Sequence, residues 1–307
     1  MGSPEASSPP VEGVRAQATR RQHLTLRVGP LCVAVEGPGV FRWRVDAAYA
    51  PFLSFDTRPD LRLAVESGPA GAPPGPPVFQ MDTLAGIHRD EMSWVFRLGE
   101  EEDPSNAVDR VLTLNGTGNA GTLRMDAERF PRLVNDYPLS YPLEDLLFRH
   151  LLPSRNAVLM HACGVAWEGR GFLFVGSSGA GKSTAARLWK AAGATILNDD
   201  RIVLEATGDG VLIHPTPWSG DVPDVGGGPT PLAGLYFLRQ GLPIVFEPVH
   251  PATAVSLAYA KSFPPLWDPE RIAGTLEVLD AVCRRVPCGW LTIPPDQRAV
   301  SWMQGQP

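Results

Sequence analysis

One segment of the sequence combines the residue types that bind phosphate groups. Residues 176–183 read GSSGAGKS and match the pattern G-x-x-x-x-G-K-[S/T] at every fixed position. The glycines permit a tight turn that brings backbone N–H groups to phosphate oxygens, and Lys182 offers an ammonium to the β- and γ-phosphates. The hydroxyl of Ser183 suits Mg²⁺. The predicted phosphate-binding residues are Gly176, Ser177, Ser178, Gly179, Ala180, Gly181, Lys182, Ser183 and Thr184.

Two adjacent carboxylates, Asp199 and Asp200, follow Lys182 after 17 and 18 residues. They lie within residues 194–204 (ATILNDDRIVL), between two apolar runs that predict strands. Side chains of adjacent residues in an extended backbone point in opposite directions, so one carboxylate can face Mg²⁺ while the other faces an acceptor or holds the loop. The flanking strands disfavour an exposed Asp-Asp turn. The short spacing predicts that both carboxylates lie beside the phosphate loop.

A histidine, His161, precedes Lys182 by 21 residues, on the strand before the one that leads into the phosphate loop. An imidazole at this place can lie near the γ-phosphate. A single histidine of this kind is more typical of a packed core. The phosphate loop and the aspartate pair favour the functional interpretation here.

The elements that must position these residues alternate between helices and strands. Residues 142–152 have leucines at helical spacing, and residues 157–167 and 171–175 read as two buried strands before the loop. A helix follows the loop at 184–192. Strands are predicted further along at 235–238, 244–246 and 286–293, and helices at 251–260 and 268–284.

The preceding part of the chain is predicted to be rich in strands. Two alternating runs at 23–28 and 31–36, joined by Gly29-Pro30, predict a hairpin. Residues 67–77 (SGPAGAPPGPP) cannot pair in a sheet and predict an exposed loop. Further strands are predicted at 41–45, 93–98, 108–114 and 122–126. The expected organisation is a disordered tail at 1–20, a β-rich domain at 21–135 and a phosphate-binding domain at 136–307.

The composition excludes several classes of protein. The 307 residues carry a net charge of −6, which argues against nucleic-acid binding, and no apolar run is long enough to cross a membrane. The first 13 residues have neither the basic nor the apolar segment of a targeting signal, so we expect a cytoplasmic protein. Of the 27 basic residues only Lys182, Lys190 and Lys261 are lysines, and the last two lie in no comparable motif.

The combination of His161, the GSSGAGKS loop and Asp199-Asp200-Arg201 resembles the catalytic domain of HPr kinase/phosphorylase. That family shares its nucleotide-binding core, more distantly, with ATP-dependent phosphoenolpyruvate carboxykinase. The resemblance covers residues 142–302. It is strongest to the HPr-kinase-related proteins encoded beside peptide-modification genes, including kinases of lasso-peptide precursors, and the segments 215–220 (PTPWSG) and 235–239 (LYFLR) add to it. It implies a P-loop domain with a mixed sheet, and the β-rich N-terminal domain does not obviously match the family. Together the two parts predict an α/β fold class, with the β-rich domain before the P-loop domain.

The resemblance also implies a reaction and roles for single residues. The reaction would be in-line transfer of the γ-phosphoryl group of Mg·ATP to a Ser or Thr hydroxyl of a peptide or small protein. Asp199 would accept the hydroxyl proton or bind the metal, Asp200 would support the metal or its waters, and His161 would lie by the γ-phosphate. The catalytic candidates are His161, Lys182, Asp199 and Asp200, and the Mg²⁺ ligands are Ser183, Asp199 and Asp200.

One departure from the family concerns the acceptor side of the site. HPr kinases carry a Glu-x-Arg-Gly segment after the aspartate pair, and no such segment follows Asp199-Asp200 in this sequence. Behind Trp218, either Asp221 or Asp224 could replace its acidic residue, or both are ordinary loop residues; residues 226–231 would form a flap. HPr as substrate and a phosphorylase activity are therefore in doubt. A small-molecule kinase and a non-catalytic nucleotide-binding regulator stay open as alternatives, as does a homo-oligomer.

Overall fold

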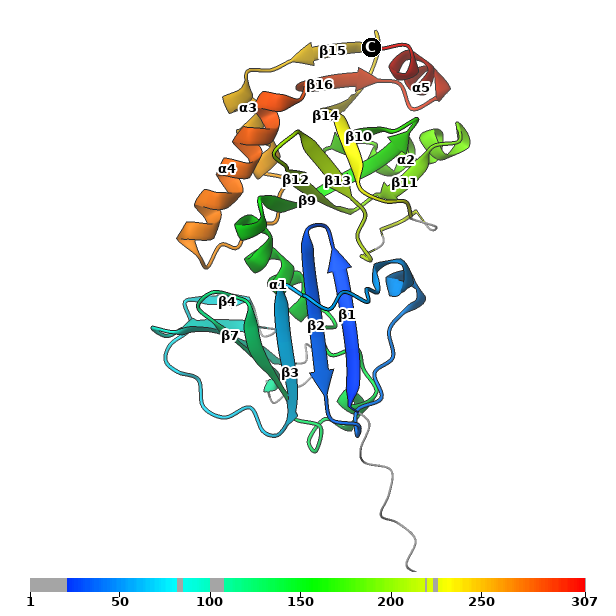
Figure 1. Ribbon diagram of the computed structural model, residues 1–307. Helices are drawn as coiled ribbons and strands as arrows, with labels where there is room; N and C mark the ends of the chain where they lie inside the picture. The colour runs from blue at the N-terminus through cyan, green and yellow to red at the C-terminus, as the bar shows by residue number, and fades with distance from the viewer. Residues whose placement is uncertain (1–20, 82–84, 100–107, 219, 223–225, 307) are drawn as a thin grey trace, which may run out of the picture.

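The computed structural model describes residues 21–81, 85–99, 108–218, 220–222 and 226–306, and within them the chain forms two eight-stranded sheets (Figure 1). The tail expected at 1–20 lies outside the described residues. The fold is α/β with a β-rich N-terminal region, as the sequence predicts. No helix among the described residues is long and apolar enough to span a membrane.

The N-terminal sheet is mostly antiparallel, with strand order β1-β2-β3-β8-β7-β6-β5-β4. Strand β3 pairs in parallel with both β2 and β8. Its strands are β1 (Gln22–Val28), β2 (Leu31–Gly37), β3 (Leu61–Ser67), β4 (Phe79–Met81), β5 (Ala85–Arg89), β6 (Ser93–Gly99), β7 (Val108–Asn115) and β8 (Ala120–Met125). Short 3-10 helices occupy Ala47–Phe52, Pro131–Val134 and Leu152–Arg155.

Most of the predictions for this sheet are confirmed, and one is wrong. The hairpin forms as β1 and β2, with Gly29 in the left-handed region at φ 59°, and residues 68–78 form a largely exposed loop. Residues 41–45 form no strand. Their alternation reflects burial without pairing, because Phe41 is fully buried and stacks with Trp43 at 6.2 Å between ring centres. Strands β3, β4 and β5 were not predicted from the sequence.

The C-terminal sheet is mixed, with order β10-β9-β12-β13-β14-β16-β15, β11 beside β9, and a further pairing between β10 and β14. Strand β14 is parallel to β10 and β16, and the other pairs are antiparallel. Its strands are β9 (Ala157–Trp167), β10 (Arg170–Val175), β11 (Thr195–Asn198), β12 (Arg201–Ala206), β13 (Val211–His214), β14 (Thr230–Gln240), β15 (Val245–Pro248) and β16 (Cys288–Ile293). Its helices are α1 (Leu143–Leu151), α2 (Lys182–Ala191), α3 (Pro251–Tyr259), α4 (Pro269–Arg285) and α5 (Gln297–Gln304). Strand β13 and helix α5 were not predicted.

Helices cover both faces of the C-terminal sheet, so its central strands are buried on both sides. One core joins side chains of α3 and α4 to the sheet, and a second core joins α2 and α5 to the opposite face. Trp189 of α2 stacks on Phe172 of β10 at 5.1 Å between ring centres. This packing fixes α2, and therefore the start of the helix after the phosphate loop, against the sheet.

Helix α1 connects the two sheets. Its side chains Leu143, Leu146 and Leu147 are fully buried in the core of the N-terminal sheet, although α1 follows the boundary expected at residue 135. Val203 of β12 belongs to the same core, and a Cβ on Gly29 in the β1–β2 turn would lie 2.7 Å from a Val203 methyl group. The tip of the N-terminal hairpin therefore packs closely on the C-terminal sheet, as Figure 1 shows.

Candidate active site

The predicted phosphate loop connects β10 to α2. Gly179 (φ 79°) and Gly181 (φ 106°) adopt left-handed conformations, which only glycine takes without strain. A Cβ on Gly176 would lie 2.6 Å from the Cβ of Ala180, so the loop is tight at its start as well. Helix α2 begins at Lys182, and its free N–H groups and positive dipole end face the loop. A strand, a glycine loop and a helix N-terminus thus form an anion-binding geometry.

The ammonium of Lys182 lies over the start of this loop. Its Nζ donates hydrogen bonds to the carbonyl oxygens of Gly176 (2.9 Å) and Ser177 (3.4 Å). The residue is 8% exposed. Burial lowers the pKa of Lys182, Asp200 opposes this effect and the positive charge of Lys261 adds to it.

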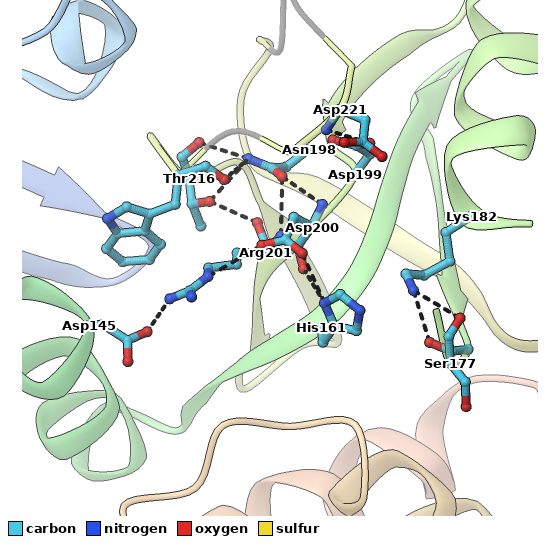
Figure 2. Close-up of polar contacts among 12 residues, drawn as sticks. Asp145, His161, Ser177, Lys182, Asn198, Asp199, Asp200, Arg201, Thr216 and Asp221 are labelled. Carbon is cyan, nitrogen blue, oxygen red and sulfur yellow. Dashed lines mark hydrogen bonds and ion pairs between the residues drawn. The ribbon is translucent and has the colours of Figure 1, made fainter. Parts of the chain in front are cut away.

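The aspartate pair lies in the short turn between β11 and β12, and a fully buried amide holds that turn. The Oδ1 of Asn198 accepts hydrogen bonds from the backbone N–H groups of Asp200 (2.8 Å) and Arg201 (3.1 Å). Its Nδ2 donates to the carbonyl oxygens of Thr216 (3.1 Å) and Trp218 (3.0 Å). Asn198 therefore connects the pair to the segment after β13 (Figure 2). We did not single it out in the sequence, although it directly precedes the pair.

Asp199 is a buried carboxylate with spare hydrogen-bonding capacity. The residue is 4% exposed, and its Oδ2 accepts a hydrogen bond from the backbone N–H of Asp221 at 3.2 Å. Within the described residues, its Oδ1 has no hydrogen-bond partner. A Cβ on Gly220 would lie 2.5 Å from this oxygen, so the segment before Asp221 packs directly on the carboxylate. A buried acceptor without a partner costs free energy, so a ligand or a proton that binds to Oδ1 would remove this cost.

Asp200, in the turn before β12, contacts His161 of the neighbouring strand β9. The Oδ1 of Asp200 lies 3.0 Å from Nδ1 of His161, which is opposite Arg201 in the strand register. The hydrogen bond from His161 lowers the pKa of Asp200, and the positive charge of Arg201 adds to this effect. The guanidinium of Arg201 also pairs with Asp145 of α1. Polar contacts therefore connect α1 to His161 through Arg201 and Asp200 (Figure 2).

These groups surround one cavity of about 500 Å³. Its lining residues are His161, Ser178, Gly179, Gly181, Lys182, Ser183, Thr184, Arg187, Asp199, Asp200, Gly220, Asp221 and Gln240. The structure thus brings together the predicted histidine, phosphate loop and aspartate pair with Asp221, one of the two candidates named behind Trp218. Asp224 lies outside the described residues. The ring of Trp218 packs edge-on against Phe148 of α1 at 5.3 Å between ring centres, and Trp218 is not among the lining residues that the structure describes.

Two lining residues were not expected from the sequence. Arg187 lies one helical turn beyond Ser183, a spacing that places both on one face of α2 and could have identified it. Gln240 ends β14 and donates a hydrogen bond through Nε2 to the carbonyl of Gly179 at 3.1 Å. The contact of Gln240 depends on the parallel pairing of β14 with β10, which the sequence does not reveal.

The segment after α3 lies against the phosphate loop and His161, although Lys261 and Phe263 are not among the described lining residues of the cavity. Lys261 donates a hydrogen bond from Nζ to the hydroxyl of Ser177 at 3.0 Å. The ring of Phe263 meets the ring of His161 edge-on at 6.2 Å, and the Arg201 guanidinium lies 4.9 Å from the centre of the same ring. The sequence around Lys261 matches no motif. The scarcity of lysine in the chain is the one feature that could have drawn attention to this residue.

One family comparison bears on this region. A family model described as the SynChlorMet cassette protein ScmC matches residues 146–225. The matched range contains His161, the phosphate loop and the aspartate pair. Comparison with curated proteins gives no significant match.

Proposed function

We propose that this protein is an ATP- and Mg²⁺-dependent kinase related to HPr kinase, which transfers the γ-phosphoryl group to a hydroxyl of a peptide or small protein. One observation carries the proposal. Asp199, a buried carboxylate with a free oxygen, lines the same cavity as Lys182 and the phosphate loop. Phosphoryl transfer needs this combination, because the phosphates must be held in place beside a metal ligand or a proton acceptor.

The residues of the cavity fit a magnesium ion. Ser183, Asp199 and Asp200 line it together, and the free oxygen of Asp199 is a donor that Mg²⁺ accepts. No group of three or more His, Cys, Asp or Glu side chains is arranged to hold a metal in the described parts of the chain. Mg²⁺ at phosphate sites commonly takes one or two carboxylates, with phosphates and waters as its other ligands. When bound, it would neutralise charge on the phosphate oxygens.

In the proposed reaction the side chains of the cavity have separate roles. The loop amides, the N-terminus of α2 and Lys182 hold the terminal phosphates. His161 keeps Asp200 ionised and oriented through the 3.0 Å contact. Asp199 either takes the proton of the acceptor hydroxyl or serves as a metal ligand, and both roles require its free oxygen. Catalysis in this scheme comes from positioning and charge, without a covalent intermediate.

The proposed acceptor class comes from the family resemblance, whereas the proposed reaction comes from the residues of the cavity. The resemblance to kinases encoded beside peptide-modification genes favours a peptide. The matching family is described only as a cassette protein, which names no activity. The proposal therefore depends mainly on the site itself.

The test is transfer of labelled γ-phosphate from Mg·ATP to a panel of Ser- and Thr-containing peptides and hydroxylated metabolites. We expect label on a peptide, and at least about a 10²-fold loss in Lys182→Ala, because the main cation at the phosphates is removed. Lys190→Ala, which removes an exposed lysine from the same helix, should retain the activity. Label on metabolites alone would identify a small-molecule kinase. Tight ATP binding without transfer to any acceptor would favour a regulator.

A further inference from the structure

Two of the three lysines of this chain converge on one residue of the phosphate loop. Lys182 donates to the carbonyl oxygen of Ser177 at 3.4 Å, and Lys261 donates to the Ser177 hydroxyl at 3.0 Å. The second lysine comes from the segment after α3, far from the loop in the sequence. Neither ammonium forms an ion pair with a carboxylate among the described residues.

The backbone around Lys261 is fixed to β9. The carbonyl of Lys261 accepts a hydrogen bond from the backbone N–H of His161 at 2.7 Å. Ser262 forms an antiparallel bridge with Met160, and the N–H of Phe263 donates to the carbonyl of Leu159 at 2.9 Å. The segment therefore runs along β9 like a short extra strand. Its position relative to His161 is set by backbone contacts, whereas the long side chain of Lys261 can move at its tip.

The local charge favours an anion between the two lysines. Two ammonium groups near one residue repel each other, and the helix N-terminus beside them adds positive potential. A phosphate oxygen relieves this repulsion. The ammonium of Lys182 lies over the first residues of the loop. Because the lysine of such loops reaches the β- and γ-phosphates, the terminal phosphates are expected at this place.

We propose that Lys261 is a second phosphate-binding cation of this site and contacts the γ-phosphate of the bound nucleoside triphosphate. The inference rests on the proposed function. Lys261 exchanges its hydrogen bond to Ser177 for one to a γ-phosphate oxygen, on the side of the loop that faces His161. There it stabilises the negative charge that the equatorial oxygens carry during transfer. A merely structural lysine that ties the loop to the end of α3 would not distinguish between nucleotides.

The experiment compares the affinity for ATP and ADP, measured by calorimetry with Mg²⁺ present. We expect Lys261→Met to weaken ATP binding by about tenfold or more while ADP binding changes by less than about threefold, because ADP lacks the contacted phosphate. Lys261→Arg should restore most of the ATP affinity, since it keeps the charge on a long side chain. Lys190→Met is the matched control for loss of one lysine charge, and thermal melting checks that each variant is folded.

Each possible result decides the inference. Equal losses for ATP and ADP, or a Lys261→Met protein that binds like Lys190→Met, would overturn the γ-phosphate contact while leaving the kinase proposal in place. A wild-type protein that binds neither nucleotide would overturn the proposed function and this inference together.

Discussion

Two buried aspartates, one in the N-terminal sheet and one in a turn of the C-terminal region, differ in how their charges are compensated. The side chain of Asp109 in β7 is fully buried, with one oxygen 3.4 Å from Nε of Arg110 and the other 2.8 Å from Nη2 of Arg132. Asp199, between β11 and β12, is almost as buried but has no ion-pair partner among the described residues. One of its oxygens accepts a hydrogen bond from a backbone N–H, and the other has no hydrogen-bond partner in the described parts of the chain.

The difference distinguishes a carboxylate whose charge is compensated within the fold from one that has capacity left for a ligand. Asp109 is paired on both oxygens, so removing it would leave a buried guanidinium without its anion. Asp199 is buried without an ion pair among the described residues, and such a cost is typical of residues kept for binding or catalysis. Burial alone does not distinguish the two residues, whereas the set of partners does.

The largest expected effect comes from Asp199→Asn. The variant should lose phosphoryl transfer by at least about 10³-fold, because the amide neither takes a proton nor binds Mg²⁺ well. Its free energy of unfolding should stay the same or rise, since an unpaired buried charge disappears. Transfer assays and urea denaturation measure the two quantities. A wild-type rate of phosphoryl transfer in Asp199→Asn would contradict both the role proposed for Asp199 and the proposed site.

Asp109→Asn should show the opposite pattern. We expect the free energy of unfolding to fall by about 3 kcal/mol, because Arg110 stays buried without its anion. Transfer per folded molecule should not change. Asp56→Asn is the matched control, since it removes a surface pair with Arg27 (2.6 Å) and should destabilise the protein far less. An Asp109→Asn protein that keeps the wild-type free energy of unfolding but transfers phosphate much more slowly would contradict the distinction between Asp109 and Asp199.

Gly220→Ala tests how closely Asp199 is positioned. The added Cβ would lie 2.5 Å from its Oδ1 and 2.9 Å from the Cβ of Asp200, so one of these groups must shift. Displacements of this size should lower the transfer rate by about 10- to 100-fold. Gly208→Ala adds the same atom where no neighbour lies within 4 Å, and it should behave like wild type. Equal activity of the two variants would show that the site tolerates the shift.

A third buried carboxylate, Glu144 of α1, relieves its burial by holding a proton. Burial raises its pKa from 4.5 to about 7, although the Tyr49 hydroxyl donates to it at 2.7 Å. Between these pH values the folded protein binds a proton that the unfolded chain releases, so stability should fall as pH rises from 4.5 to 7. We expect a loss on the order of 2 kcal/mol. Denaturation midpoints of wild type and Glu144→Gln across this range measure it, and parallel curves would contradict the assignment.

Much of the C-terminal fold follows from local patterns in the sequence. The apolar runs of β9 and β10, the glycine loop and the helix after it are encoded by neighbouring residues, and the structure places them accordingly. The same is true of the short spacing that brings the aspartate pair to the loop. Strand β3 carried a readable alternation as well, with Leu61, Leu63 and Val65 buried, and we missed it.

The features that escaped prediction depend on contacts between distant segments. Lys261 reaches the loop only because its backbone pairs along β9, and Trp218 turns toward Phe148 only because α1 packs beside it. The alternation at 41–45 led to a wrong prediction, because Phe41 is buried by side-chain packing and its segment pairs with no strand. Side-chain periodicity reports which face is buried, and it does not report what covers that face.

Helix α1 has a final consequence for how the protein unfolds. Its leucines complete the core of the N-terminal sheet, while Asp145 on the same helix holds Arg201 beside the active site. Loss of packing in either sheet therefore removes support from the other. We expect the two sheets to melt in one cooperative transition, so that the charged groups around the candidate site are lost at the same temperature as the N-terminal core.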